Sequence, residues 1–210
     1  ERRPDQKEFL VYDLFGGVAA DVDASELEAC GHIMPVGIRV MPTAFRAEWY
    51  SQLARPTLRH RKRLFYDIVA DPERNQQAVE LAVAEAEAGH RVVVWSHRKE
   101  HCLQLDAAVS ARGVRSGLLL GGPDYRTVFE ETTDGLRDGT VRVGVGTLGG
   151  RAPSGTGWNV PPLDRGLIST PFASNRQPIN QARGRLSRRD RAPGAGKSDA
   201  FLTYMHDVHV

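Results

Sequence analysis

Five arginines fall within nine positions, from 183 to 191, with one acid among them. A guanidinium is always charged, and its planar fork of donors matches phosphate oxygens. On a helix, positions spaced by three, four and seven residues share one face: Gln181, Gly184, Arg185 and Arg188. The glycine leaves the backbone open to a bulky group. The stretch therefore predicts two guanidiniums presented to one polyanionic group, with a solvated basic helix as the alternative.

The sequence Gly194-Ala195-Gly196-Lys197-Ser198 suggests a phosphate loop, but its context argues against one. A phosphate loop needs glycine where Arg191 stands, and it joins a strand to a helix. Here the segment separates a basic helix from a final strand, so we interpret it as a surface turn. The sequence has no other Gly-Lys-Ser/Thr and no Asp-Glu dipeptide. We conclude that these 210 residues cannot build an NTPase site alone.

Residues 97–101 fit the H-x-x-E-H pattern of a group of zinc proteases. On a helix His97 and His101 would lie one turn apart and could share a metal. No downstream acid completes such a site, and short motifs often mislead. We keep a zinc hydrolase as a minor alternative. A serine nucleophile motif is absent, and the Gly144-Val145-Gly146 run is interpreted as close packing at a strand.

Helices and strands alternate from Asp71 onward. We expect helices over 71–89, 98–112 and 124–137 and strands over 91–95, 116–120, 141–145, 164–170 and 200–204, with the basic helix before the last strand. Upstream, we expect a short helix from Asp23 to Cys30, a strand over 36–41 that ends at Pro42, and a helix over 44–66 with a basic run at 59–63. We expect residues 1–35 to form a connector or edge segment and 36–210 the main domain.

This alternation predicts an α/β fold with a parallel sheet and helices on both faces. Function in such sheets gathers at the carboxyl ends of the strands. We expect four segments to meet at that edge: Ser96–Arg98, Gly121–Pro123, Thr147–Asn159 and Pro171–Arg188.

Composition limits the classes of partner and the cellular compartment to be expected. The net charge is +2, so the basic residues act through local clusters rather than a global excess. Two cysteines argue against a disulfide framework and suit a reducing compartment, so we expect a cytoplasmic protein. There is no apolar run long enough for a bilayer, so no membrane partner is expected. Because the chain begins with Glu1, we expect it to be a piece of a longer protein.

Taken together, these segments resemble the C-terminal RecA-like lobe of superfamily 2 DNA/RNA helicases, of the phage and repair type. Residues 181–188 match the family's motif VI, Q-x-x-G-R-x-x-R, at every defined position. Residues 92–98 are similar to motif IV, and 141–147 with 157–161 to motif V. The resemblance covers about residues 10–205. It implies a phosphate-loop NTPase-like fold that lacks the phosphate loop.

The resemblance also implies roles. ATP and Mg²⁺ would be held with an N-terminal RecA-like lobe that carries the phosphate loop and the magnesium ligands. Arg185 and Arg188 would act as arginine fingers and Gln181 would place the attacking water or the γ-phosphate. Gly157, Asn159 and Gly184 would contact ATP. A nucleic acid, DNA rather than RNA, would be gripped by five residues: Ser96, His97, Arg98, Gly121 and Thr147.

Two features depart from the family's pattern. Asn159 stands where motif V usually has Asp, so an acceptor is kept but the charge is lost. The loop between Thr147 and Gly157 is longer and richer in glycine than usual. The main alternative is a non-catalytic module of the same fold that binds nucleic acid or docks a protein.

Overall fold

The computed structural model describes residues 22–148, 158–171, 177–190 and 197–209. The chain divides into two compact units, Glu1–Ile33 and Met34–Val210. In the first unit, the helix α2 (Ala24–Ala29) begins where the Asp23 carboxylate accepts a hydrogen bond from the Ser25 amide. All the described strands belong to the second unit.

Six strands and seven helices are described in the second unit, in this order: β1 (Gly37–Arg46), α3 (Glu48–Ser51), α4 (Leu58–Ala70), α5 (Pro72–Glu87), β2 (Val92–Ser96), α6 (Lys99–Ser110), β3 (Ser116–Leu119), the 3₁₀ helix η1 (Pro123–Tyr125), α7 (Arg126–Asp138), β4 (Val143–Thr147), β5 (Arg165–Ile168), α8 (Gln177–Leu186) and β6 (Phe201–His209).

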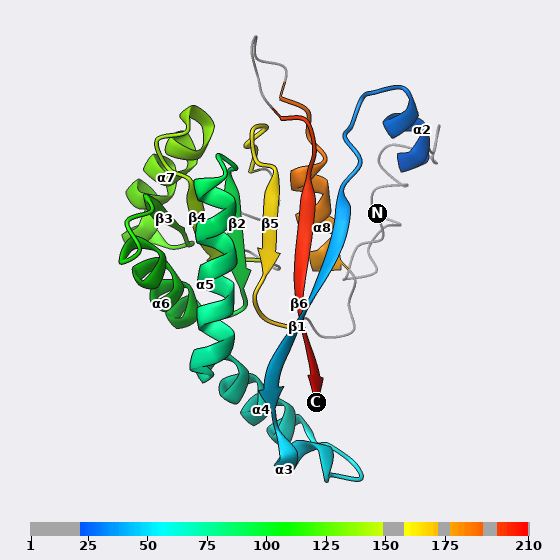
Figure 1. Cartoon of the computed structure of the whole chain (residues 1–210), viewed down its shortest axis with the longest axis vertical. Helices are drawn as coiled ribbons and strands as arrows, with labels where there is room; N and C mark the ends of the chain where they lie inside the picture. The colour runs from blue at the N-terminus through cyan, green and yellow to red at the C-terminus, as the bar shows by residue number, and fades with distance from the viewer. Residues whose placement is uncertain (1–21, 149–157, 172–176, 191–196, 210) are drawn as a thin grey trace, which may run out of the picture. The chain divides into compact units, whose positions relative to one another are not determined.

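The strands form one parallel sheet in the order β1-β6-β5-β2-β4-β3, as Figure 1 shows. Every recorded pairing is parallel, which confirms the predicted sheet. Strands β2, β4 and β5 are buried along almost their whole length, as expected where helices cover both faces.

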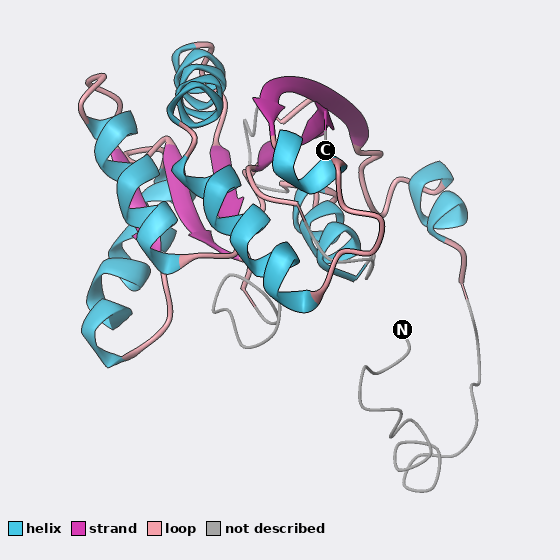
Figure 2. Ribbon diagram, turned by 90° about the horizontal axis from the view of Figure 1, so that it is seen from below, coloured by secondary structure: helices cyan, strands magenta, loops and turns pink. Residues whose placement is uncertain are grey.

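Two hydrophobic clusters fill the two faces of the sheet. The ribbon in Figure 2 shows the helices on both sides of the strands. On one face, α5 and α6 pack on Val92, Val94 and Val145. On the other, α7 and α8 pack on Val93, Trp95 and their neighbours. The alternation along β2 follows from the strand period of two. At Gly146 an added Cβ would lie 2.5 Å from the Leu119 carbonyl oxygen, which confirms the close-packing interpretation of this glycine.

The segment before α5 differs from the prediction. Strand β1 does not end at Pro42 but continues to Arg46, because it is an edge strand with only β6 beside it, where proline is tolerated. The single helix expected over 44–66 is instead two helices, α3 and α4, separated around Pro56. The second begins at Thr57, whose hydroxyl accepts a hydrogen bond from the His60 amide, and it runs on to Ala70.

Candidate arginine site and strand-end turns

Two guanidiniums meet at one backbone carbonyl. Nη1 of Arg185 donates a hydrogen bond to the Trp158 carbonyl oxygen. Nη1 of Arg188 donates to the same oxygen at 2.6 Å and to Asn159 Oδ1 at 2.5 Å. The motif-VI-like and motif-V-like segments, far apart in sequence, are therefore joined through two arginines.

The two arginines do not share a helix. The helix α8 ends at Leu186, so Arg188 lies beyond it, and the expectation that 181–188 is one helical face is wrong for Arg188. The Ser187 amide still donates to the Arg183 carbonyl, which closes the helix. The two side chains converge because both donate to the Trp158 carbonyl, and Asn159 Oδ1 holds Arg188 in addition.

The Trp158–Asn159 segment is fixed from a second helix, α7. The Trp158 indole nitrogen donates to Thr133 Oγ1 at 3.0 Å. Arg137 donates to the Asn159 carbonyl through Nε at 3.2 Å and Nη2 at 3.0 Å, and it also pairs with Asp134. Three arginines thus surround two consecutive residues. No sequence pattern singles out Arg137, which occupies an ordinary exposed position of a helix.

The site is short of negative charge. Among the described residues, neither Arg185 nor Arg188 has an ion pair with an acid. Arg185 is only 7% exposed, and its Nε, also buried, has no hydrogen-bond partner there. Burial, and for Arg185 the neighbouring Arg188, lowers the pKa of both guanidiniums. Buried donors without an acceptor are unfavourable, so the arrangement suits an anion.

Four other residues are predicted from the sequence to act with these arginines: Gln181, Gly184, Gly157 and Asn159. Gln181, four residues before Arg185 on α8, is half-buried. A Cβ at Gly184 would meet nothing within 4 Å, so the helix surface is open there. Gly157 lies outside the described residues. The side chain of Asn159, which stands where the family usually has Asp, acts as a hydrogen-bond acceptor, because its Oδ1 accepts from Arg188.

Lys197 holds the C-terminal end of α8. Its Nζ donates to the carbonyls of Leu186 at 2.6 Å, Arg188 at 2.7 Å and Pro161 at 3.3 Å. Burial lowers its pKa to about 8. The ammonium satisfies carbonyls that a helix end leaves without partners. A lysine interpreted from sequence as part of a surface turn therefore ties the motif-VI-like segment to the segment after Asn159.

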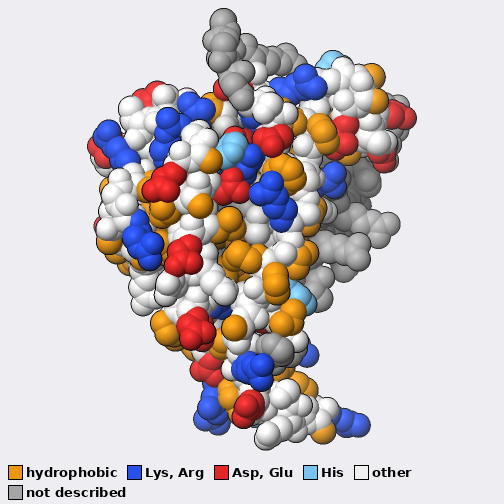
Figure 3. Space-filling view, viewed as in Figure 1, with side chains coloured by type: hydrophobic (Ala, Val, Ile, Leu, Met, Phe, Trp, Pro, Cys, Tyr) orange, Lys and Arg blue, Asp and Glu red, His pale blue; other side chains and the backbone are white. Residues whose placement is uncertain are grey.

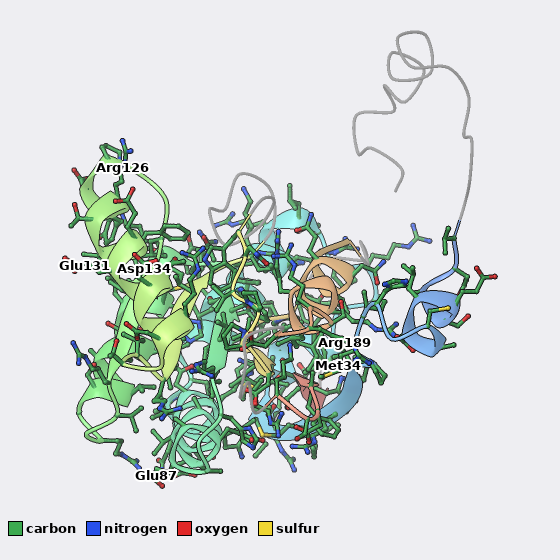
Figure 4. All side chains as sticks on the ribbon, turned by 90° about the horizontal axis from the view of Figure 1, so that it is seen from above. Met34, Glu87, Arg126, Glu131, Asp134 and Arg189 are labelled. Atoms are coloured by element: carbon green, nitrogen blue, oxygen red, sulfur yellow. The ribbon has the colours of Figure 1, made fainter. Side chains whose placement is uncertain are left out.

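The arginine site does not lie at the carboxyl edge of the sheet. After β5, the chain returns along α8, so the end of α8 approaches the edge where strands begin. The Met34 amide, just before β1, donates to the Ser187 carbonyl at 2.7 Å, and Figure 4 shows Met34 beside Arg189. The expected meeting of four segments is thus wrong for Trp158–Asn159 and Arg185–Arg188. A crossover helix places its last turn at the opposite edge from its first.

At the carboxyl edge, Ser96 begins a chain of buried hydrogen bonds. Ser96 Oγ lies 2.9 Å from His101 Nδ1, and His101 Nε2 lies 2.7 Å from Asn75 Oδ1. Because Asn75 Nδ2 donates to the Val69 carbonyl, Asn75 Oδ1 accepts, and the imidazole proton is assigned to Nε2. Ser96 then donates to Nδ1 and accepts from the Arg98 amide at 3.1 Å. The turn after β2 is thereby tied to the start of α5.

This chain of hydrogen bonds makes the free energy of unfolding depend on pH through His101. Burial first, and the Arg74 charge second, lower the His101 pKa to about 4. In the unfolded chain the imidazole has a pKa near 6.5, so between about pH 6.5 and 4 it is protonated there but neutral in the native protein. The free energy of unfolding should therefore fall as the pH drops through this range. The loss attributable to His101 should be about 3 kcal/mol. Urea unfolding at several pH values measures it, with His101→Gln as the comparison. A variant with an unchanged pH profile would contradict this assignment.

The other predicted contacts of this edge are accessible. His97 is exposed, and its amide donates to Thr170 Oγ1 at 3.1 Å. Arg98 lies over the rings of Tyr66 and Phe65. Gly121 is exposed before Gly122, whose φ of 115° favours glycine. Thr147 ends β4 and is half-buried. The structure thus gathers Ser96–Arg98, Gly121 and Thr147 at the ends of neighbouring strands, with Ser96 itself buried.

The geometry argues against metal at two histidine sites. Both ring nitrogens of His101 are already bonded to Ser96 and Asn75, so His97 and His101 do not share a free ligand pair. Near the start of β5, His90, Asp164 and Asp199 are spaced as ligands could be. There the Arg165 guanidinium donates to His90 Nε2 at 2.8 Å and to Asp199 at 3.0 Å. The positive charge beside His90 and Asp199 is thus the Arg165 guanidinium of the protein itself.

Neither a protein-family model nor a curated protein sequence matches the chain. Solved structures do. T4 UvsW matches with a TM-score of 0.63 and 14% identity, over 82% of this chain and 32% of that one. Dbp5 of S. cerevisiae, solved bound to RNA and ADP BeF3, matches with a TM-score of 0.60 and 10% identity, over 98% of this chain and 43% of that one. The C-terminal part of the Fun30 ATPase domain matches with a TM-score of 0.50 and 14% identity, over 66% and 44%.

These similarities confirm the predicted RecA-like fold, a six-stranded parallel sheet flanked by helices. The chain spans less than half the length of each of these structures. Among the described residues, none of the helices combines the length and apolar character needed to cross a bilayer.

Proposed function

We propose that this chain is the C-terminal motor lobe of an ATP-dependent helicase or translocase acting on nucleic acid. The observation that carries the proposal is the arginine site: two adjacent guanidiniums, one buried, on carbonyl acceptors and without an acid among the described residues. Phosphate oxygens are the ligands that such a pair matches best. The fold shared with Dbp5, which was solved with ADP BeF3 and RNA, supports it.

In this proposal, the substrate ATP lies between this lobe and a second lobe that carries the phosphate loop and the magnesium ligands. Arg185 and Arg188 release the Trp158 carbonyl and donate to the transferring phosphoryl group, stabilising charge that develops in the transition state. Gln181 orients the attacking water. Gly157, Asn159 and Gly184 contact ATP. The donors of this site fit phosphate oxygens rather than Mg²⁺, which needs oxygen ligands.

A nucleic-acid strand would be held at the carboxyl edge of the sheet. His97, Arg98, Gly121 and Thr147 contact its sugar–phosphate backbone, largely without reading bases. Ser96 acts indirectly, because its buried hydroxyl positions the Arg98 amide. Closing on ATP and opening after hydrolysis would shift this grip along the strand. We propose DNA rather than RNA as the partner.

The chain by itself should bind nucleic acid and turn over no ATP. Its affinity for a labelled strand, measured by fluorescence anisotropy, should fall steeply with salt, because binding releases counterions from phosphates. Phosphate release from ATP should equal the enzyme-free blank. Robust hydrolysis by the chain alone would contradict the two-lobe site, and salt-insensitive binding would contradict a surface that follows the backbone.

A further inference from the structure

An aromatic platform lies beside the turn after β2. We define it as Phe65 and Tyr66 of α4 with His97 and Arg98 of the turn. The Arg98 guanidinium carbon lies 4.6 Å from the Tyr66 ring centroid and 5.5 Å from that of Phe65. The Phe65 and His97 rings are 5.7 Å apart. Two segments separated by about 30 residues thus build one surface of planar groups at the carboxyl edge.

Tyr66 is the exposed part of this platform. The residue is 56% exposed although Arg98 lies over its ring. The helix α4 packs through Ile68, on its other side, into a small hydrophobic cluster with Phe45 and Ala47. Tyr66 is not part of this cluster. An exposed aromatic ring carrying a guanidinium on one face is a surface on which another planar group can stack.

A basic stripe leads away from the platform along α4. Arg59 and Lys62 precede Tyr66 by seven and four residues, so all three share one face over about 10 Å. Both basic residues are exposed, and among the described residues neither has an ion pair. Arg63, in contrast, lies 4.2 Å from the Trp49 ring centroid and 3.9 Å from Asp67. The stripe therefore carries uncompensated positive charge next to a stacking surface.

Figure 3 shows Lys and Arg side chains with apolar ones among them over the end of the molecule that α3 and α4 form. In Figure 1 these helices lie just past the arrowheads of the strands. Within α3 and α4 the acids are Glu48 and Asp67, and Asp71 follows at the end of α4. Asp67 already accepts from the Trp49 indole at 3.0 Å. The charge of this surface complements a polyanion.

We propose that the aromatic platform and the basic stripe bind single-stranded nucleic acid. An unpaired base stacks on Tyr66, and phosphates follow Lys62 and Arg59. A single strand fits better than a duplex, because only unpaired bases present a free ring face. An acidic peptide would satisfy the stripe but would leave the platform unused. The inference rests on the proposed function for its partner class and extends the predicted contacts at His97 and Arg98 to α4.

The test is anisotropy of this chain with a fluorescein-labelled oligodeoxythymidylate of about 20 nucleotides. Tyr66→Ala should weaken binding roughly 5- to 100-fold with an unchanged salt slope, whereas Tyr66→Phe, which keeps the ring, should bind as wild type. Combining Arg59→Ala with Lys62→Ala should reduce the salt slope by about 1.4. Arg126→Ala, on α7 with a side chain 81% exposed, removes a charge elsewhere and should change neither quantity (Figure 4).

Several results would overturn the inference. Wild-type affinity of Tyr66→Ala, preference for a duplex of equal length, or equal competition by polyglutamate at matched charge would each do so. So would absence of binding at low salt. The proposed function is judged separately, by ATP hydrolysis in variants of Arg185, and that assay does not use this surface. If the Arg185 variants lose ATP hydrolysis but Tyr66→Ala binds nucleic acid as wild type, the aromatic platform is rejected and the proposed function stands.

Discussion

Replacing Arg185 with alanine should reduce ATP hydrolysis by roughly 10³-fold or more in a protein that joins this chain to the proposed phosphate-loop lobe. An arginine finger contributes about 10³–10⁵ in rate, because it stabilises charge present only in the transition state. Single-turnover phosphate release measures the effect. Affinity for nucleic acid should change little, since Arg185 lies on the α8 side of the sheet, away from the turn after β2.

Two arginines of the same segment provide matched controls. Arg183 and Arg189 are exposed, and Arg183→Ala and Arg189→Ala remove the same charge. Both variants should hydrolyse ATP within a few-fold of wild type. Because Arg185 also bonds the Trp158 carbonyl, thermal unfolding must be compared for each variant. A folded Arg185→Ala protein with near-normal turnover would remove the finger role.

Replacing Arg74 with methionine should lower the free energy of unfolding by about 3–5 kcal/mol. The Arg74 side chain is fully buried, and its Nε pairs with Asp207 Oδ1 at 2.8 Å. It also donates to the Ser169 carbonyl, and the Thr43 hydroxyl donates to Asp207 at 2.6 Å. Without the guanidinium, a buried carboxylate on β6 is left without its cation. Urea unfolding measures the loss, which corresponds to a melting temperature roughly 10 °C lower.

The double variant Arg74→Met with Asp207→Leu separates the two explanations for such a loss. If the uncompensated carboxylate is responsible, removing it should restore much of the stability. Arg126→Ala breaks an exposed pair with Glu130 and should change stability by less than about 0.5 kcal/mol. A loss in Arg74→Met no larger than in Arg126→Ala would show that the buried pair contributes little.

The regular part of the fold could be predicted because its signals are local. Asp71 before Pro72 marks the start of α5, and the Asp71 carboxylate does accept from the Arg74 amide at 2.7 Å. The apolar run before Ser96 predicts a strand buried on both faces. The extent of β1 past Pro42 could not be predicted, because it depends on which strand lies at the edge.

The candidate site was predictable as a set of residues but not as an arrangement. The spacing of motif VI singles out Arg185 and Arg188, yet the end of α8 between them and the carbonyls they bind depend on tertiary packing. The roles of Arg137 and Lys197 have no local pattern at all. His101 was considered as a metal ligand, and only the positions of Ser96 and Asn75 show it to be part of a buried relay.

The most direct measurement is a structure of the protein that joins both lobes, bound to nucleic acid and to ADP with beryllium fluoride in place of the γ-phosphate. We predict that guanidinium nitrogens of Arg185 and Arg188 leave the Trp158 carbonyl and lie about 2.7–2.9 Å from fluorides of that group. If both guanidiniums remain on the Trp158 carbonyl and contact no part of the nucleotide, the arginines do not complete an ATP site.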